Sequence, residues 1–326
     1  MTGTVLDLAI IGAGPCGLAA GVAAKRHGLV AELFDRSSVV SSIVAYPTYI
    51  TFFSTAEKIA IGEFPFTVAS EKPTRRDALA YYRDVVTRAG LAVRAFEPVE
   101  RVEREGAHFV LRSRTADAVR DTRARAVVIA TGYFATPRRL GVSGESLPHV
   151  THYFREGHEA FQRDAFVVGG GNSMVETALD LVRAGARVTV AHVGPTFDRN
   201  IKPWVRPEFE ARVADGSIAM RWDTRVTAIR PGWVDVTGPA GSEAVKADHL
   251  YLLTGVSPSS ELTGPLGVHF DPETNVPSHD PVTMETNVRG VYVAGVLVSG
   301  NDANRIFIEN GRDHGELIAA HLAVKR

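Results

Sequence analysis

Three glycines near the start of the chain have a spacing that suits phosphate binding. Gly12, Gly14 and Gly17 form the pattern G-x-G-x-x-G between an apolar run and an Ala-rich segment. The first glycine permits a tight turn, the second lets the backbone approach a pyrophosphate, and the third lets helix and strand pack closely. Asp35 follows at about the 20-residue spacing at which an acid bonds a ribose hydroxyl. These residues predict a bound dinucleotide; the alternative is a glycine turn without a ligand.

Cys16 lies inside this pattern and is the only cysteine of the 326 residues. A thiol at the start of a helix feels the positive end of the helix dipole, which lowers its pKa and favours the thiolate. The sequence therefore offers Cys16 as a redox-active thiol, with a small space-filling residue as the alternative. One cysteine cannot form an internal disulfide, a Cys-x-x-Cys pair or a cysteine-rich zinc site. The cysteine count also favours a reducing, cytoplasmic setting.

A second glycine-rich run lies in the middle of the chain. Gly169 and Gly171 fit the same pattern, but Met174 stands where glycine or alanine is expected. His192 follows the next apolar run and is either a phosphate contact or a surface residue. The end of that run offers no acid for an NAD ribose, and it offers no arginine for a 2′-phosphate unless Arg199 reaches back. We predict a nicotinamide nucleotide here, with a fold that has lost its ligand as the alternative. The predicted contacts are Gly169, Gly171, Asn172, Ser173 and His192.

Apolar runs and helical segments around the two patterns indicate the fold class. Each pattern joins an apolar strand to a helix that a second strand follows, over residues 6–35 and 165–191, and each is thus a βαβ unit. Further apolar runs end in glycine, where backbone can approach a ligand closely. We predict an α/β protein with two Rossmann-like dinucleotide-binding domains. Residues 1–135 and 255–326 form the first, discontinuous domain, and residues 136–254 form the second.

Composition excludes several classes of function. Lys plus Arg number 36 and Asp plus Glu 37, so no basic field exists for nucleic acid or an anionic membrane. No stretch is apolar enough to span a bilayer, and glycines interrupt the uncharged run at residues 8–24, which argues against a signal sequence. His149, His152 and His158 cluster, but no second segment stands out to complete a metal site, so we expect no metal.

The two glycine patterns and the discontinuous first domain resemble the two-domain flavoprotein reductases of thioredoxin-reductase type. The chain looks most like the bacillithiol-disulfide reductases, over essentially its whole length. Like that branch, it lacks the Cys-x-x-Cys of thioredoxin reductases, and Val296 follows Gly295 where those enzymes have aspartate. The segments that carry the resemblance are Gly12–Gly17 with its cysteine, Tyr46–Thr48, Thr51–Ser54, Glu57–Lys58, Ala80–Arg83, His152–Phe154, Glu156–His158, Ile201–Trp204 and Ile306–Arg312.

The resemblance implies FAD in the first site and NADPH in the second. NADH is also possible, because Val193 stands where that branch has an arginine for the 2′-phosphate. The backbone at Gly295 and near Ile306 and Phe307 is expected to meet the flavin. Arg312 and Glu309 are expected to form a structural ion pair, with a substrate-side pair as the alternative. The residues expected at the FAD site are Gly12, Gly14, Pro15, Cys16, Gly17, Asp35, Tyr46, Pro47, Thr48, Thr131, Gly132, Gly295, Ile306 and Phe307.

The resemblance implies an FAD-dependent pyridine-nucleotide disulfide oxidoreductase that serves redox homeostasis. It would reduce a low-molecular-weight disulfide, that of bacillithiol, with Cys16 forming a mixed disulfide as the catalytic residue. A cytoplasmic homo-oligomer, dimer or tetramer, is expected. Two alternatives remain: a flavoenzyme without a thiol step, of the ferredoxin/flavodoxin reductase or monooxygenase kind, and a flavin-loaded redox-sensing binding module. The monooxygenase signature F-x-G-x-x-x-H is not present, since Phe154 to His158 has the wrong spacing.

Overall fold

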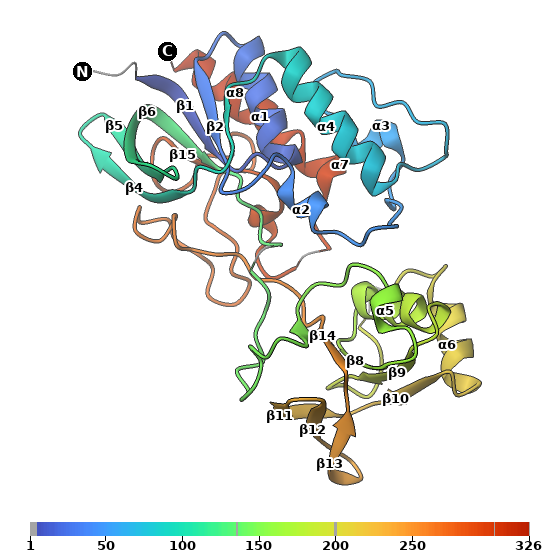
Figure 1. Ribbon diagram of the computed structural model, residues 1–326. Coiled ribbons are helices and arrows are strands. Elements are labelled where there is room, and N and C mark those ends of the chain that lie inside the picture. Colours follow the sequence, from blue (N-terminus) through green and yellow to red (C-terminus); the bar gives the residue numbers. More distant parts are fainter. Residues whose placement is uncertain (1–4, 135, 199–200, 303, 326) are drawn as a thin grey trace. The chain divides into compact units, whose positions relative to one another are not determined.

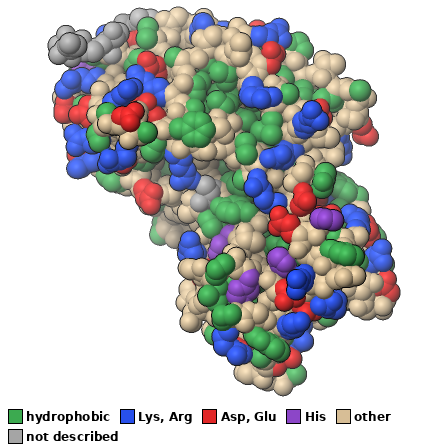
Figure 2. Space-filling model, in the orientation of Figure 1, with side chains coloured by type: hydrophobic (Ala, Val, Ile, Leu, Met, Phe, Trp, Pro, Cys, Tyr) green, Lys and Arg blue, Asp and Glu red, His purple; other side chains and the backbone are tan. Residues whose placement is uncertain are grey.

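The computed structural model describes residues 5–134, 136–198, 201–302 and 304–325. The chain forms two compact units (Figure 1). The first consists of Met1–Val44, Ile50–Thr136 and Val256–Arg326, and the second of Ala45–Tyr49 and Pro137–Gly255. Acidic and basic side chains are interspersed on the face drawn in Figure 2, in keeping with the net charge of −1. Among the described residues, no helix is both long and apolar enough to cross a membrane.

The first unit is built on a mixed sheet of seven strands in the order β3-β2-β1-β6-β5-β4, with β15 also paired to β6. Strands β1, β2, β3, β6 and β15 are parallel where they pair, whereas β5 and β4 extend the sheet as antiparallel strands. The carboxyl ends of β1, β6 and β15 therefore meet at one edge, where ligands bind in such sheets. The strands are β1 (Leu6–Ile11), β2 (Ala31–Phe34), β3 (Val93–Arg94), β4 (Val99–Glu105), β5 (His108–Arg114), β6 (Val119–Ile129) and β15 (Val291–Val293).

Helices of the first unit pack closely because small residues lie at their contacts. Gly315 of α8 approaches α1 so closely that a Cβ on it would lie 2.5 Å from the Ala20 Cα. Thr74 and Asp77 form a capping box at the start of α4, and Gly90 ends that helix in the left-handed conformation. The helices are α1 (Pro15–Arg26), α2 (Ser41–Val44), α3 (Ala56–Ile59), α4 (Arg75–Ala89), η2 (Gly295–Ser299), α7 (Ile308–Gly311) and α8 (His314–Val324).

The second unit has a parallel five-stranded sheet in the order β10-β9-β8-β14-β7 and a separate antiparallel sheet β11-β12-β13. The strand that precedes the second glycine run, β8, lies between β9 and β14, so the run follows a strand at the topological switch point. The elements are β7 (Val150–Thr151), η1 (His158–Ala160), β8 (Asp164–Val168), α5 (Asn172–Arg183), β9 (Arg187–Ala191), α6 (Arg206–Ala214), β10 (Ile218–Arg221), β11 (Arg225–Arg230), β12 (Trp233–Gly238), β13 (Gly241–Lys246) and β14 (His249–Leu252).

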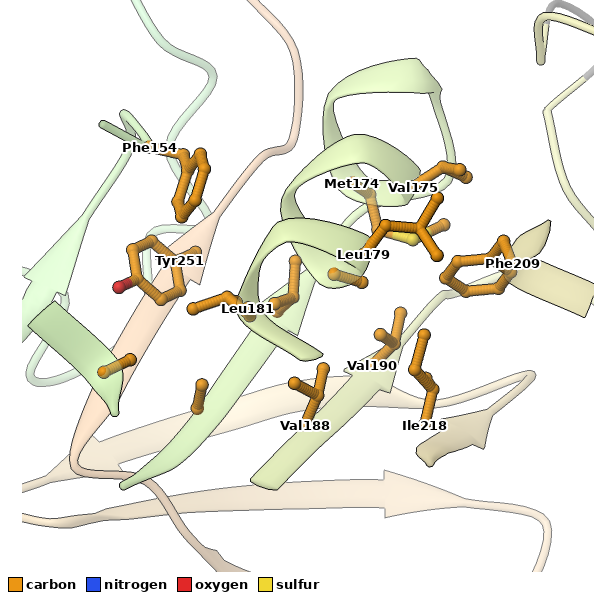
Figure 3. Packing of buried hydrophobic residues seen from close by; sticks show 14 residues of the cluster. Phe154, Met174, Val175, Leu179, Leu181, Val188, Val190, Phe209, Ile218 and Tyr251 are labelled. Carbon is orange, nitrogen blue, oxygen red and sulfur yellow. The ribbon is translucent and has the colours of Figure 1, made fainter. Parts of the chain in front are cut away.

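Helix α5 packs onto this parallel sheet through its apolar face (Figure 3). Met174 is fully buried and lies with Leu179 in the cluster that contains Phe209 of α6. Met174 is therefore a core residue, and its thioether fills a space that a small residue would leave empty.

Both predicted βαβ units are confirmed. The first runs through β1, α1 and β2, and the second through β8, α5 and β9. The antiparallel strands β4, β5, β11, β12 and β13 were not predicted. β12 alternates polar and apolar residues over a short stretch, and β4 and β13 are mostly polar, so both signals are weaker than the continuous apolar runs of the parallel strands.

Candidate functional site

The first glycine loop connects β1 to α1 and is built around close backbone contacts. Gly12 has φ +111°, and a Cβ on it would collide with the Ala130 carbonyl oxygen. A Cβ on Gly17 would collide with the carbonyl oxygen of Gly12. At Gly14, by contrast, no described atom beyond its neighbours along the chain lies within 4 Å of the position that a Cβ would take. Gly12 and Gly17 thus hold the loop together, while Gly14 leaves open space at the start of α1.

The start of α1 suits an anion. Its N-cap is Gly14, which has no side chain to accept the first amides, and its first turn, residues 15–18, is uncharged. Amide groups and the positive end of the helix dipole therefore face the space beside Gly14. These features fit the pyrophosphate of FAD.

Asp35 follows β2 and is tied to the glycine loop. Its carboxylate accepts hydrogen bonds from the amides of Ala13, at 2.8 Å, and Ser37, at 2.9 Å. Burial raises the pKa of Asp35, although the two amides act in the opposite direction. Each carboxylate oxygen retains a second lone pair, so Asp35 can hold the loop and still accept a ribose hydroxyl.

The Cys16 sulfur lies in a slot between two glycines of distant segments. A Cβ on Gly295 would lie 3.1 Å from the sulfur, and one on Gly311 would lie 3.0 Å from it. Burial raises the pKa of Cys16 to about 12, and the nearby charge of Asp313 adds to this shift. The expectation of a lowered pKa is wrong, because the loss of solvent outweighs the helix dipole. At neutral pH Cys16 is a protonated thiol.

Two amides that were expected to meet the flavin are already used inside the protein. The Gly295 amide donates to His314 Nδ1 at 3.1 Å, and the Phe307 amide donates to Asn310 Oδ1 at 2.7 Å. Burial lowers the pKa of His314, with a further contribution from His279, which keeps the ring neutral and its Nδ1 able to accept. Sequence reasoning missed His314, although it lies two residues beyond the segment that ends at Arg312.

The remaining predicted residues of the first unit gather near the same sheet edge. Thr131 follows β6, and its amide nitrogen lies 3.0 Å from the position of a Cβ on Gly12. Gly132 has φ +60°, and a Cβ on it would lie 3.7 Å from Val296 Cγ1. Ile306 Cγ2 would lie 3.1 Å from a Cβ on Gly311, beside the sulfur slot. The loops after β1, β6 and β15 thus come together as a site.

Tyr46, Pro47 and Thr48 group with the second unit, in which the Thr48 amide donates to the Arg155 carbonyl at 2.8 Å. Sequence reasoning had placed this segment in the first domain.

Arg312 and Glu309 serve the architecture of the first unit. The Arg312 guanidinium donates to the backbone carbonyls of Glu57, at 2.9 Å, and Ala60, at 2.5 Å, whereas Glu309 accepts from the Ser54 hydroxyl at 3.1 Å. Each therefore ties the C-terminal segment to the region around α3. The charged partner of Arg312 is Asp313, at 3.8 Å, and not Glu309, so the expected Arg312–Glu309 ion pair is wrong.

The second glycine loop is open on the side of Gly171. A Cβ on Gly169 would lie 2.7 Å from the Leu253 carbonyl oxygen and 3.1 Å from Met174 Cβ. For Gly171, the one described atom within 4 Å of the Cβ position is Asp198 Oδ2, at 3.8 Å. Gly171 is also the N-cap of α5, whose first turn is uncharged. The loop therefore has room for a nucleotide phosphate at a helix N-terminus.

The other predicted residues of this loop differ in their surroundings. His192 is only 9 % exposed, and its ring lies against Gly170 and edge-to-face with Trp222, so its interpretation as a surface residue is wrong. Asn172 Oδ1 accepts from the Lys202 amide at 2.8 Å and thereby holds the loop after β9. Ser173 is exposed at the start of α5. Arg199 lies outside the described residues.

Of the three clustered histidines in the second unit, His149 and His152 are half-buried and His158 is exposed. His152 Nε2 lies 3.3 Å from Glu145, and burial lowers the pKa of His152. Glu145 in turn accepts from the amides of Leu140 and Gly141. In the part of the chain that the structure describes, no three histidine, cysteine or acidic side chains form a metal-binding group.

Comparison with known proteins agrees with this geometry. The pyridine nucleotide-disulphide oxidoreductase family matches residues 9–295. The chain is 45% identical over 317 residues to the bacilliredoxin reductase Bdr of Bacillus subtilis (strain 168), covering 96% of each chain. The bacillithiol disulfide reductase Bdr of Bacillus cereus has a TM-score of 0.97 at 42% identity, covering 99% of this chain and 100% of that one. Its counterpart from Staphylococcus aureus has a TM-score of 0.93 at 39% identity, with the same coverage.

The thioredoxin reductase of T. acidophilum shares the fold alone. Its TM-score is 0.73 at 20% identity, over 98% of each chain. The predicted thioredoxin-reductase-like fold is confirmed.

Proposed function

Because the chain belongs to the pyridine nucleotide-disulphide oxidoreductase family, we propose that it reduces the disulfide of a low-molecular-weight thiol with Cys16 as its catalytic residue. FAD and a reduced nicotinamide nucleotide are its cofactors. We assign bacillithiol disulfide as the substrate, since the two related structures at 42% and 39% identity are described as reductases of that disulfide. The observation that carries the proposal is the placement of the Cys16 sulfur beside the first glycine loop, between Gly295 and Gly311.

FAD and the nucleotide supply, when bound, the two electrons that disulfide reduction requires. The chain supplies the binding sites for these groups. Gly14 and the start of α1 bind the pyrophosphate of FAD, and Asp35 accepts a ribose hydroxyl. Gly171 and the start of α5 bind the phosphates of the nicotinamide nucleotide.

Cys16 supplies the thiol. Attack of its sulfur on a disulfide R–S–S–R forms Cys16–S–S–R and releases R–S⁻, which takes up the proton lost by Cys16. Two electrons and two further protons then cleave the mixed disulfide into the Cys16 thiol and a second R–SH. One reduced nucleotide would supply the electron pair and one of these protons, and solvent the other, so that one nucleotide yields two thiols R–SH. Burial, which raises the pKa of Cys16, keeps the resting residue protonated and protects it from oxidation between turnovers.

The test compares the wild-type protein with Cys16→Ser and Cys16→Ala, each loaded with FAD. Anaerobic bleaching of the flavin absorption by the nucleotide measures the first half of the reaction, and release of bacillithiol from its disulfide measures the second. We expect both variants to bleach at a rate within about twofold of wild type and to lose at least 100-fold in disulfide reduction. Full disulfide reduction by Cys16→Ser would remove Cys16 from the mechanism. Full bleaching without disulfide reduction in the wild type would favour the flavoenzyme without a thiol step.

A protein disulfide is the second candidate substrate, because the Bacillus subtilis relative at 45% identity is described as a bacilliredoxin reductase. The same variants distinguish the two substrates when a bacilliredoxin mixed disulfide replaces bacillithiol disulfide in the assay. A higher kcat/KM for the protein would make it the preferred substrate. We also propose a cytoplasmic homo-oligomer, a dimer or tetramer, which light scattering of the purified protein would test.

A further inference from the structure

We propose that the second nucleotide site selects NADH over NADPH, through the carboxylate of Asp198 above the glycine loop and the uncharged Val193 at the end of β9. The inference rests on the proposed function and deepens it by naming the electron donor. The sequence alone leaves the choice of nucleotide open at Val193 and does not point to Asp198.

Asp198 is held over the second glycine loop by the backbone. Its amide donates to the Gly170 carbonyl at 3.1 Å, and the Lys202 amide donates to Asn172 Oδ1 at 2.8 Å. These two bonds return the segment after β9 to the start of α5. The Asp198 side chain is 61% exposed, and its Oδ2 lies 3.8 Å from the position of a Cβ on Gly171. A carboxylate thus faces the open side of the loop where a nucleotide would bind.

The three residues that follow β9 are His192, Val193 and Gly194. None of them carries a positive charge when the histidine is neutral. Val193 is apolar and 53% exposed. The His192 Nε2 lies 3.9 Å from Asp198 Oδ1, so a protonated ring there would face the carboxylate first. In Rossmann-like sites the residues at this strand end recognise the 2′ position of the adenosine ribose.

Two basic side chains on neighbouring elements, Arg221 and Lys202, contact other groups. The Arg221 guanidinium, at the end of β10, is paired with Glu243. Lys202 Nζ lies 5.8 Å from the ring centroid of Trp204, and its charge lowers the pKa of Glu176, which burial raises.

The charge pattern discriminates between the two nucleotides. A free 2′-hydroxyl donates to a carboxylate such as that of Asp198, as acids do in NAD-binding sites. A 2′-phosphate carries about −1.5 to −2 charges at pH 7 and would instead repel Asp198, with Val193 offering no compensating donor. NADH is therefore the nucleotide that the described side chains favour.

The test measures binding separately from turnover. The FAD-loaded protein is titrated calorimetrically with NAD⁺ and NADP⁺, and the kcat/KM for NADH and NADPH is measured alongside. We expect wild type to bind NAD⁺ at least tenfold more tightly than NADP⁺. Asp198→Asn and Val193→Arg should each raise the affinity for NADP⁺ about tenfold, and neither should raise the affinity for NAD⁺. Asp117→Asn, which removes an exposed acid from the first unit, is the control and should change neither affinity.

Three results would overturn the inference, and they separate it from the proposed function. A wild-type preference for NADP⁺ with normal disulfide reduction would overturn the inference and leave the proposed function standing. If Arg199→Ala then lost that preference, the 2′-phosphate would be assigned to Arg199. Equal effects of Asp198→Asn on both nucleotides would show that its charge does not read the 2′ position. Binding of neither nucleotide would remove the second site as a nicotinamide site and would overturn the proposed function as well.

Discussion

The loops at Gly12–Gly17 and at Gly169–Met174 both join a buried parallel strand to a helix, but they differ at the third position of the pattern. A Cβ on Gly17 would collide with the Gly12 carbonyl, whereas Met174 places a whole side chain at the corresponding position of the second loop. A Cβ on Gly169 would lie 3.1 Å from the Met174 Cβ. The contact between strand and helix in the second loop therefore has room for a side chain on Met174 but not on Gly169 as well. The same pattern therefore serves two different strand–helix contacts.

The loops also differ in the group that each helix start presents. Cys16 and Ser173 occupy corresponding positions, yet Cys16 is enclosed by Gly295 and Gly311, while Ser173 is exposed. The nearby acids differ in the same sense. Asp35 uses its carboxylate to hold the first loop through two amides, whereas Asp198 presents its carboxylate to the open side of the second. Distant segments thus cover the side chain at this position in the first loop and leave it exposed in the second.

The largest predicted difference is in thiol reactivity. Burial raises the pKa of Cys16 from its ordinary 9.0 to about 12, so we expect its thiolate fraction at pH 7.5 to be lower by about 1000-fold. We expect the FAD-loaded protein to react with iodoacetamide about 1000-fold more slowly than a free thiol. Because deprotonation is incomplete below pH 12, the rate should rise about tenfold for each pH unit from 7 to 10.

The matched control moves the thiol to the second loop. Ser173→Cys in a Cys16→Ser background places a thiol on an exposed helix start, where its pKa is lowered rather than raised. It should react at least as fast as a free thiol at pH 7.5. A Cys16 rate that levels off below pH 9 would contradict the raised pKa of its thiol.

Substitutions of glycine sharpen the comparison of the loop backbones. Gly17→Ala would drive a Cβ into the Gly12 carbonyl, which cannot retreat without moving β1, and should cost at least about 3 kcal/mol and most of the bound flavin. Gly14→Ala should leave the stability within about 1 kcal/mol of wild type but still weaken flavin binding, since its Cβ enters open space. Urea unfolding and the ratio of visible to protein absorption measure both effects. Equal flavin loss with unchanged stability in both variants would contradict the assigned roles.

Met174→Ala tests the corresponding position of the second loop. Met174 is fully buried against the apolar cluster of α5 and α6, so truncation should cost about 3 kcal/mol. The nucleotide affinity should remain within about twofold of wild type, because the side chain points into the core. Met174→Leu keeps the volume and should cost less than about 1.5 kcal/mol. A gain in nucleotide affinity for Met174→Ala would show instead that the methionine obstructs the site.

The two βαβ units were predictable because each is encoded within about thirty residues, by an apolar run, a glycine pattern and a second apolar run. The sign of the Cys16 pKa shift was not predictable. The residues that enclose the sulfur, Gly295, Gly311 and Asp313, lie near the other end of the chain. The position of Cys16 at a helix start indicates the helix dipole, but not the loss of solvent that opposes it.

The position of Asp198 beside the second glycine loop was not predictable for a related reason. Two hydrogen bonds hold the segment of Asp198 beside the glycine loop. The Asp198 amide donates to the Gly170 carbonyl, and the Lys202 amide donates to Asn172 Oδ1. The path of a loop between a strand and a helix has no periodicity from which to read it. For His192, the neighbours Gly170 and Trp222 likewise come from separate elements, and its burial was not apparent from the strand that precedes it.

The smallest predicted effect concerns the histidine beside each loop. His314 Nδ1 accepts the buried amide of Gly295, and His314→Ala would leave that amide unpaired at a cost of about 1–3 kcal/mol. His314→Asn offers a carbonyl oxygen at the same distance along the side chain and should recover most of the loss. His192 covers Gly170 through ring packing, so His192→Asn should be no better than His192→Ala. The midpoints of urea unfolding and the alkylation rate of Cys16 provide the measurements. If the slot around the Cys16 sulfur depends on the hydrogen bond to Gly295, His314→Ala should speed alkylation of Cys16 about tenfold and His314→Asn less than twofold. Identical rates in the two variants and the wild type would mean that the slot holds its shape without the histidine.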